Sequence, residues 1–377
     1  MKKYILIIAM FCFGFLFQSC SEDDYPIPPA STVPEFSYNI DNEELAPATV
    51  IFTNMSIVPE TVGTVTYYWN FGDGQFSSEA NPSHFYSEAG VYDVNLVVTT
   101  AKSLEIKQST KTIVIKDPNA SGFPIYFTDG SQVYQGLINS QAPIFTPLNG
   151  VAAQSSYGMV LDTIHDKLYI SDYGSDKIYR SNLDGSNFED FRTGMDSPNG
   201  MTIDYENNQI YWDTSSGIQR GDIDNTDVAQ KEDFVTGQSN DPDGLSIDPV
   251  NRKLYWVNYN GGVWVKNLDG TGETLLIPDV EGGSILVVND RIYYDEYVES
   301  GDIRIKSANL DGTNISTFAV GIGRVVYGIA YEPDGQKIYW GDRDTDTLWR
   351  ANLDGTNPEA WFESTGDTRG VVIGKKL

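Results

Sequence analysis

Hydrophobic residues in this chain fall into short runs separated by polar turns, and one run recurs from residue 125 onward. Each copy pairs an aliphatic residue with a tyrosine, usually followed by a second aromatic residue. The copies begin at Ile125, Leu168, Ile210, Leu254, Ile292 and Ile338. The tyrosines lie 43, 42, 44, 38 and 46 residues apart. Such a period is typical of a repeat architecture, and runs of this length predict strands.

Three further segments accompany each tyrosine run. A glycine-led apolar segment precedes it, as in 200–204 and 244–248, and a polar turn separates the two. A third segment follows and ends in a turn such as Asp184-Gly185, before a short fourth segment. Asp-Gly tolerates the positive backbone angles of a tight hairpin. Four short strands per period predict a β-propeller blade, and no sustained helical period occurs.

The order of the segments predicts how the ring closes. The first blade starts with its tyrosine run at Ile125 and has no glycine-led segment before it. A segment of that kind, 370–373, follows the sixth blade instead. We therefore expect 370–373 to form the inner strand of the first blade, which leaves no open edge in the ring. The expected six-bladed propeller spans residues 118–377.

The tyrosine run and the third segment together resemble the YWTD repeat of the low-density-lipoprotein-receptor family, over roughly residues 120–377. The resemblance implies that the aspartates of the motif tie neighbouring blades together, with calcium binding as the alternative role. These aspartates are Asp129, Asp172 and Asp342, and we expect Arg180, Arg220 and Arg350 on the third strands to be their partners. The motif is altered around Asp213 and Asp295, which weakens the expectation of inter-blade bonds in blades three and five.

Residues 33–117 carry a different alternating pattern. It predicts strands in a small β-sandwich at 49–52, 65–69, 91–98 and 112–115. The stretches 69–74 and 81–92 resemble the signatures of the PKD domain, an immunoglobulin-like sandwich. The resemblance implies a core position for Trp69 and a turn at Gly72-Asp73-Gly74, and we expect His84 to be a packing or turn residue. The expected fold class is therefore all-β, a PKD sandwich followed by the propeller.

The first 32 residues have the features of a targeting sequence. Lys2 and Lys3 precede an apolar stretch, 4–17, that is too short for a membrane span. It leads to Cys20, in a context that resembles a bacterial lipobox. This predicts a signal peptide over 1–19, lipidation (palmitate) at Cys20 and a membrane anchor through that lipid. The acidic 21–24 resembles the surface signal of Bacteroidetes lipoproteins, so we expect an outer-membrane protein facing the cell exterior, with a proline-rich linker over 20–32.

Composition narrows the function. The 53 acidic residues outnumber the 25 basic ones and give a formal charge of −28, which disfavours nucleic acid as a partner. His84 and His165 are the only histidines in the sequence, too few for a His-based triad or a multi-His metal site. Paired carboxylates remain available for acid–base chemistry. We expect no catalytic residue, no cofactor, no metal and a monomer.

Propeller topology places the loops before the inner strands and after the tyrosine strands on one face, around the channel mouth. The residues expected to bind ligand there are Tyr157, Asn199, Asp243, Tyr327 and Arg369, joined by Tyr173, Asn258, Tyr259 and Arg343, with Asp176, Tyr297 and Asp344 nearby. Tyrosines beside carboxylates and amides suit a sugar, because the ring stacks while polar groups orient hydroxyls. The sequence thus predicts a cell-surface protein that binds a glycan or another extracellular ligand. The alternatives are a lactonase or lyase using Asp243, Asn199 or Asn258 with a divalent metal, and a protein–protein platform.

Overall fold

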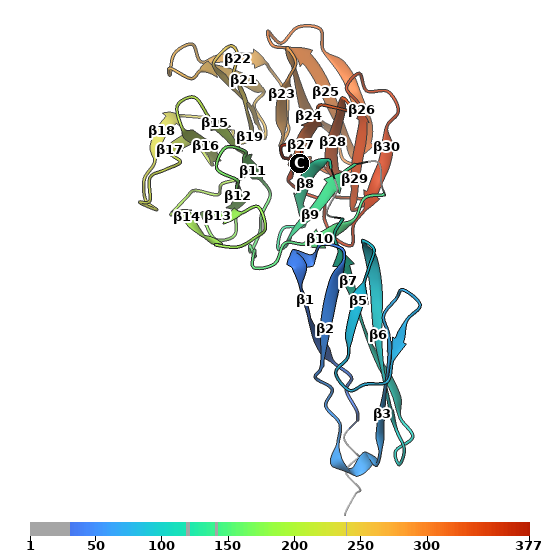
Figure 1. Cartoon of the computed structure of the whole chain (residues 1–377). Helices are drawn as coiled ribbons and strands as arrows, with labels where there is room; N and C mark the ends of the chain where they lie inside the picture. The colour runs from blue at the N-terminus through green and yellow to red at the C-terminus, as the bar shows by residue number, and fades with distance from the viewer. Residues whose placement is uncertain (1–30, 118–120, 140–141, 239) are drawn as a thin grey trace, which may run out of the picture. The chain divides into compact units, whose positions relative to one another are not determined.

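The computed structural model describes residues 31–117, 121–139, 142–238 and 240–377. The predicted signal peptide and Cys20 lie outside these residues. The chain divides into two compact units, 1–119 and 120–377 (Figure 1). Within the described residues the only helical elements are two short 3₁₀ turns, η1 (Asn42–Glu44) and η2 (Glu60–Val62), and neither could cross a membrane. The prediction of an all-β chain is confirmed.

The first unit is a sandwich of two antiparallel sheets. One sheet has the order β1 (Phe36–Ile40), β2 (Ala48–Asn54), β5 (Ser83–Tyr86), and the other β4 (Phe76–Ser77), β3 (Val65–Asn70), β6 (Gly90–Thr100), β7 (Ile106–Ile115). Trp69 lies in the core with no exposed surface, and its Nε1 donates to the carbonyl of Glu79. His84 stacks on Phe71 at 4.1 Å. The roles predicted for Trp69 and His84 are confirmed.

The second unit contains, within the described residues, six four-stranded antiparallel sheets, which are the blades of a propeller (Figure 1). From inner to outer strand, blade one consists of β31 (Val371–Ile373), β8 (Phe123–Thr128), β9 (Val133–Ile138) and β10 (Phe145–Pro147). Blade two consists of β11 (Met159–Asp162), β12 (Lys167–Asp172), β13 (Lys177–Asn182) and β14 (Glu189–Thr193). Blade three consists of β15 (Met201–Asp204), β16 (Gln209–Thr214), β17 (Gly217–Asp222) and β18 (Glu232–Val235). Blade four is β19 (Pro242–Asp248), β20 (Lys253–Asn258), β21 (Val263–Asn267), β22 (Thr274–Ile277); blade five is β23 (Ile285–Val288), β24 (Arg291–Glu299), β25 (Asp302–Asn309), β26 (Ser316–Ile322); and blade six is β27 (Ile329–Glu332), β28 (Lys337–Asp342), β29 (Thr347–Asn352), β30 (Glu359–Glu363).

The ring closes as the segment order predicts. β31 pairs antiparallel with β8, with Val371 opposite Phe127 and Ile373 opposite Ile125. The pairing continues on both sides, because Arg369 N donates to Thr128 O at 2.8 Å and Gly374 N donates to Pro124 O at 2.7 Å. One sheet therefore joins the two ends of the repeat array.

The glycine ahead of an inner strand is required by the neighbouring blade. A Cβ at Gly158 would lie 1.9 Å from the carbonyl oxygen of Asn199, and a Cβ at Gly200 would lie 2.0 Å from that of Asp243. Both distances are far below van der Waals contact, so only glycine lets adjacent inner strands approach this closely. This packing brings the residue before each glycine to the channel mouth.

The third-strand arginines do not bind the motif aspartates, and that expectation is wrong. Each arginine lies opposite the motif tyrosine and pairs with a glutamate on the outer strand of its own blade. The pairs are Arg180 with Glu189 at 2.6 Å, Arg220 with Glu232, and Arg350 with Glu359 at 2.6 Å. The aspartates lie at the other end of the tyrosine strand, outside the reach of these side chains.

Backbone amides are the partners of the aspartates instead. Asp172 accepts from the amides of Gln154 and Ser155, each at 2.8 Å, in the segment that enters its own blade. Asp295 accepts from Ser284 N at 2.8 Å and from Val326 N at 3.0 Å, in the segment that enters blade six. Blade five therefore keeps an inter-blade bond despite its altered motif, which corrects the weaker expectation for it. In blade three, Asp213 accepts from Asn199 N at 2.7 Å.

Candidate ligand-binding site

Two tyrosines and two arginines from different blades meet at the channel mouth. The rings of Tyr157 and Tyr327 lie 4.6 Å apart. The guanidinium of Arg369 lies 4.4 Å from the centre of the Tyr157 ring, and that of Arg343 lies 5.4 Å from Tyr157 and 5.0 Å from Tyr327. We call these four residues the mouth cluster. Tyr173, half exposed, adds its ring edge-on to Tyr157 at 6.2 Å.

The mouth cluster carries more positive than negative charge. Asp367 is 3.1 Å from Arg369 and 3.5 Å from Arg343, and a third arginine, Arg324, reaches the same carboxylate at 3.6 Å. The Arg343 side chain is only 7% exposed, and its Nε finds no hydrogen-bond partner in the described part of the chain. One carboxylate shared by three guanidiniums leaves a partly buried positive charge that favours an anionic group.

Carboxyl groups with raised pKa values lie beside the mouth cluster. Asn199 donates its side-chain amide to Asp243 Oδ1 at 2.7 Å. Burial raises the pKa of Asp243 well above its ordinary value. Burial also raises the pKa of Asp213, and the neighbouring charge of Asp243 adds to that shift. Burial raises the pKa of Tyr327, with a further contribution from the charge of Asp243, which places this carboxyl group next to the cluster.

Because the pKa values of these buried carboxyl groups are raised, we expect the propeller to lose stability as the pH rises. Burial raises the pKa of Asp295 from 3.8 to about 7, so the folded protein keeps a proton that the unfolded chain has lost. The contribution of this proton is complete below about pH 4 and is lost as the pH rises through about 7. Three pH units at about 1.4 kcal/mol each correspond to about 4 kcal/mol. We expect the propeller melting temperature to fall between pH 5 and pH 8.

Asp243→Asn tests the same effect at a second buried carboxyl group, whose pKa burial also raises. Asparagine keeps a carbonyl oxygen to accept the hydrogen bond from Asn199 and cannot ionise. The variant should melt several degrees higher than the wild type at pH 8, by about 2–4 °C per kcal/mol, and show a flatter pH profile. Calorimetry across this pH range checks both results. A wild-type melting temperature that rises from pH 5 to pH 8 would contradict the assignment of raised pKa values to these buried carboxyl groups.

The channel beneath the mouth is too narrow for a large ligand. Its cavity of about 170 Å³ is lined by the inner strands of all six blades, from Met159 and Met201 to Val371. Small-molecule sites usually measure about 300–1,000 Å³. A ligand would therefore lie on the mouth cluster, outside the channel.

The structure does not bring every expected residue to the mouth. Asn258 is buried and donates its side-chain amide to Gln238 Oε1 at 3.0 Å, so it faces the protein interior. Tyr297 is 40% exposed and lies on β24 of blade five. Tyr259 is 46% exposed, follows β20, and lies near enough to Tyr327 to contribute to the raised pKa of that tyrosine. Asp176 accepts from the backbone amide of Ser197. Asp344 is exposed, and its backbone amide donates to the side chain of Asp342.

Sequence reasoning missed Asp367 and Arg324, which organise the charge of the cluster. Asp367 precedes Arg369 by two residues, and Arg324 lies in the segment that enters blade six. The spacing of Asp367 and Arg369 was a visible signal. The approach of Arg324 was not, because it depends on the neighbouring blade.

No group of three or more His, Cys, Asp or Glu side chains is placed to hold a metal ion among the described residues. The oxygens of Asp129 accept from the amides of Ser131 and Gln132 and from the hydroxyl of Tyr134. Those of Asp172 are likewise bonded to backbone amides. The arrangement of these aspartates therefore supports the structural role over calcium binding.

Comparisons with known families match two parts of the chain. Residues 32–115 match the family described as PKD domain, and residues 153–280 match the SMP-30/Gluconolactonase/LRE-like region. Collagenase ColA of Bacillus cereus is 49% identical over 57 residues, 15% of this chain and 6% of that protein. Nidogen of Drosophila melanogaster is 32% identical over 225 residues, 55% of this chain and 16% of nidogen. The chain thus spans less than a fifth of either relative.

Two solved structures are similar to the propeller fold. A chain in the crystal structure of a nidogen/laminin complex superposes with a TM-score of 0.59 at 18% identity, covering 67% of this chain and 99% of that chain. TolB from Acinetobacter baumannii gives a TM-score of 0.53 at 9% identity, covering 75% of this chain and 79% of TolB. At these identities the likeness shows the fold alone. The chain is an all-β protein in which a PKD-type sandwich precedes a β-propeller.

Proposed function

We propose that this chain is a surface lipoprotein that binds an extracellular glycan at the mouth cluster. The observation that carries the proposal is the contact of two tyrosines with two arginines at the mouth of a narrow channel. Tyr157 and Tyr327 are partly exposed, so their rings can contact the apolar face of a sugar. Arg343 and Arg369 share one carboxylate with Arg324, which leaves donors for an anion.

The charge of the cluster indicates the kind of glycan. A carboxylate or sulfate on the sugar would satisfy the positive charge that Asp367 only partly balances. Asn199 and the buried Asp243 lie beside the cluster and can exchange hydrogen bonds with hydroxyl groups. We therefore infer a glycan that carries an acidic substituent, such as a uronic acid.

The location of the protein in the cell is part of the same proposal. The apolar stretch 4–17, Cys20 and the acidic 21–24 support lipidation at Cys20 and anchoring in the outer membrane with the propeller outside the cell. Mass spectrometry of the membrane fraction tests this, since an acylated peptide should begin at Cys20. Release of the protein by Cys20→Ala is the second expected result.

Calorimetry with uronic-acid oligosaccharides tests the mouth cluster. We expect binding that weakens by about tenfold or more in the Tyr157→Ala/Tyr327→Ala variant and in Arg343→Gln, because stacking and ion pairing are lost. Tyr297→Ala is the control, since Tyr297 is 40% exposed and lies near the end of β24 in blade five. Unchanged affinity in the double variant, with an unchanged melting temperature, would contradict the proposal.

An enzyme is the second candidate, favoured by the match of residues 153–280 to the SMP-30/Gluconolactonase/LRE-like region. The residues do not fit a metal-dependent lactonase well. The side-chain amide nitrogen of Asn199 faces Asp243 and that of Asn258 faces Gln238, and the described residues contain no group of three or more His, Cys, Asp or Glu side chains placed to hold a metal ion. We expect no hydrolysis of gluconolactone with added Ca²⁺ or Zn²⁺. Hydrolysis by the wild type that exceeds that of an Asp243→Ala control would favour the enzyme over the glycan-binding protein.

A protein partner, the third candidate, is tested by pull-down from the cell envelope.

A further inference from the structure

Blade five lacks an ion pair that three other blades share. In blades two, three and six, an arginine opposite the motif tyrosine pairs with a glutamate on the outer strand. In blade five the residue opposite Tyr293 is Ser307, and the residue opposite Ser307 on the outer strand is Ser316. Two small hydroxyl side chains therefore occupy the positions at which blades two, three and six have an arginine and a glutamate.

Blade five also has a shorter turn at the same end. Asn289 and Asp290 alone connect β23 to β24, with positive φ values of 47° and 54°. In blade six the corresponding turn has four residues, 333–336, between β27 and β28. The turn is two residues shorter than that of blade six and so contributes to the short, 38-residue spacing between Tyr255 and Tyr293. It also removes side chains from the space next to blade six.

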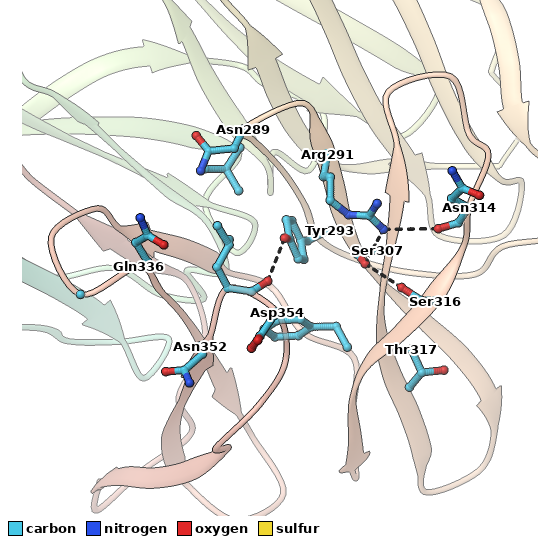
Figure 2. Close-up of a pocket in the computed structure, with 14 residues that line it drawn as sticks. Asn289, Arg291, Tyr293, Ser307, Asn314, Ser316, Thr317, Gln336, Asn352 and Asp354 are labelled. Atoms are coloured by element: carbon cyan, nitrogen blue, oxygen red, sulfur yellow. Dashed lines mark hydrogen bonds between the residues drawn. The ribbon is translucent and has the colours of Figure 1, made fainter.

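These two changes open a groove of about 820 Å³ between blades five and six. Four hairpin ends line it, and Figure 2 shows Arg291, Asn314, Ser316 and Thr317 across from Gln336 and Asn352, with Tyr293 between them. The hairpins that join first to second and third to fourth strands lie on the face opposite the channel mouth. The groove is therefore separate from the mouth cluster, and its volume falls within the range of small-molecule sites.

Arg291 supplies a cation without a carboxylate partner in the groove. It donates to Ser307 Oγ at 2.8 Å and to the carbonyl of Asn314 at 3.3 Å (Figure 2). It also donates to Asn309 Oδ1 at 3.0 Å, and all three acceptors are neutral. Lys337 holds the equivalent position in blade six, where it lies 3.9 Å from Glu359. Arg291 thus reaches into the space that an arginine–glutamate pair fills elsewhere.

We propose that this groove binds a short neutral saccharide. Its lining alternates amide and hydroxyl side chains, which donate and accept as sugar hydroxyl groups do. Arg291 adds donors and Asp354, exposed at the edge, adds an acceptor. Arg291 and Asp354 carry one charge of each sign, so their charges balance. The groove therefore does not attract a polyanion, in contrast to the mouth cluster. The buried rings of Tyr293 and Phe318 form the apolar floor.

The chain itself supplies the variant that closes the groove. Arg291→Lys, Ser307→Arg and Ser316→Glu together give blade five the residues of blade six, an arrangement the fold already accommodates. In calorimetry with neutral xylo-, manno-, cello- and malto-oligosaccharides, we expect at least one series to bind the wild type. The triple variant should lose this binding by about tenfold or more at an unchanged melting temperature.

A second variant covers the case in which the triple variant does not fold. Thr317→Ala/Gln336→Ala removes two exposed groove side chains without touching the core, and binding should weaken by about fivefold. Tyr157→Ala/Tyr327→Ala should leave neutral-saccharide binding unchanged, which separates this site from the mouth cluster. Binding of acidic saccharides alone, no binding of any neutral series at millimolar concentration, or full binding by a folded groove variant would overturn the proposal.

Discussion

Deletion of residues 368–377 is expected to unfold the propeller and leave the sandwich folded. The deletion removes β31, whose Val371 is buried against Ile125 and Phe127 of β8 and against Ala330 of blade six. It also removes Thr368, whose hydroxyl donates to the carbonyls of Asp342 and Thr347. All six residues of β8 are buried, so the open ring would expose an unpaired apolar edge. The whole cooperative transition of the propeller should disappear.

Calorimetry of the full chain tests this, because the sandwich should give its own transition as an internal reference. Limited proteolysis of the truncated chain should degrade residues 120–367 and spare residues 32–115. The control is deletion of residues 375–377, which keeps β31 and the bond from Gly374 N to Pro124 O. A propeller transition that survives the longer deletion within a few degrees would show that the closing strand is dispensable.

Trp69→Ala is expected to destabilise the sandwich by about 3–5 kcal/mol. The indole has no exposed surface and contacts the rings of Phe36 at 5.1 Å and Phe52 at 5.4 Å, which lie on β1 and β2 of the facing sheet. The substitution leaves a large cavity and removes the hydrogen-bond donor to the carbonyl of Glu79. Because a domain of this size is stable by only about 5–15 kcal/mol, much of its stability would be lost.

Urea denaturation of the isolated unit 31–117, or calorimetry of the full chain, measures the change. Tyr68→Ala is the matched control, since Tyr68 precedes Trp69 on β3 but is 47% exposed. It should cost about 1 kcal/mol or less. Equal losses in the two variants would mean that the core does not depend on the tryptophan.

Local patterns account for most of the fold prediction. The tyrosine runs, the glycine-led segments and the Asp-Gly turns each specify a short strand or hairpin through burial, close approach and positive φ, as at Gly185 and Gly355. In the sandwich, β1, β4 and β5 were missed. β1 alternates (FSYNI) but is only five residues long, β4 has two residues, and β5 (SHFY) does not alternate.

Partner choice was harder to predict than position. The arginines of the third strands were assigned to the aspartates of the motif. Register decides the pairing, and it places each glutamate directly opposite its arginine on the neighbouring strand. The repeat period alone does not determine which residues of two neighbouring strands lie opposite each other.

The sequence by itself determined the class of each domain, the number of blades and the strand that closes the ring, because these follow from repeated local patterns. Only the tertiary structure decided the sites. Arg369 lies 213 residues from Ser156, whose carbonyl accepts its hydrogen bond, and it reaches the mouth through ring closure. The groove exists because two adjacent blades differ in side-chain volume and turn length. Both sites depend on contacts between blades, which the pattern within one repeat does not encode.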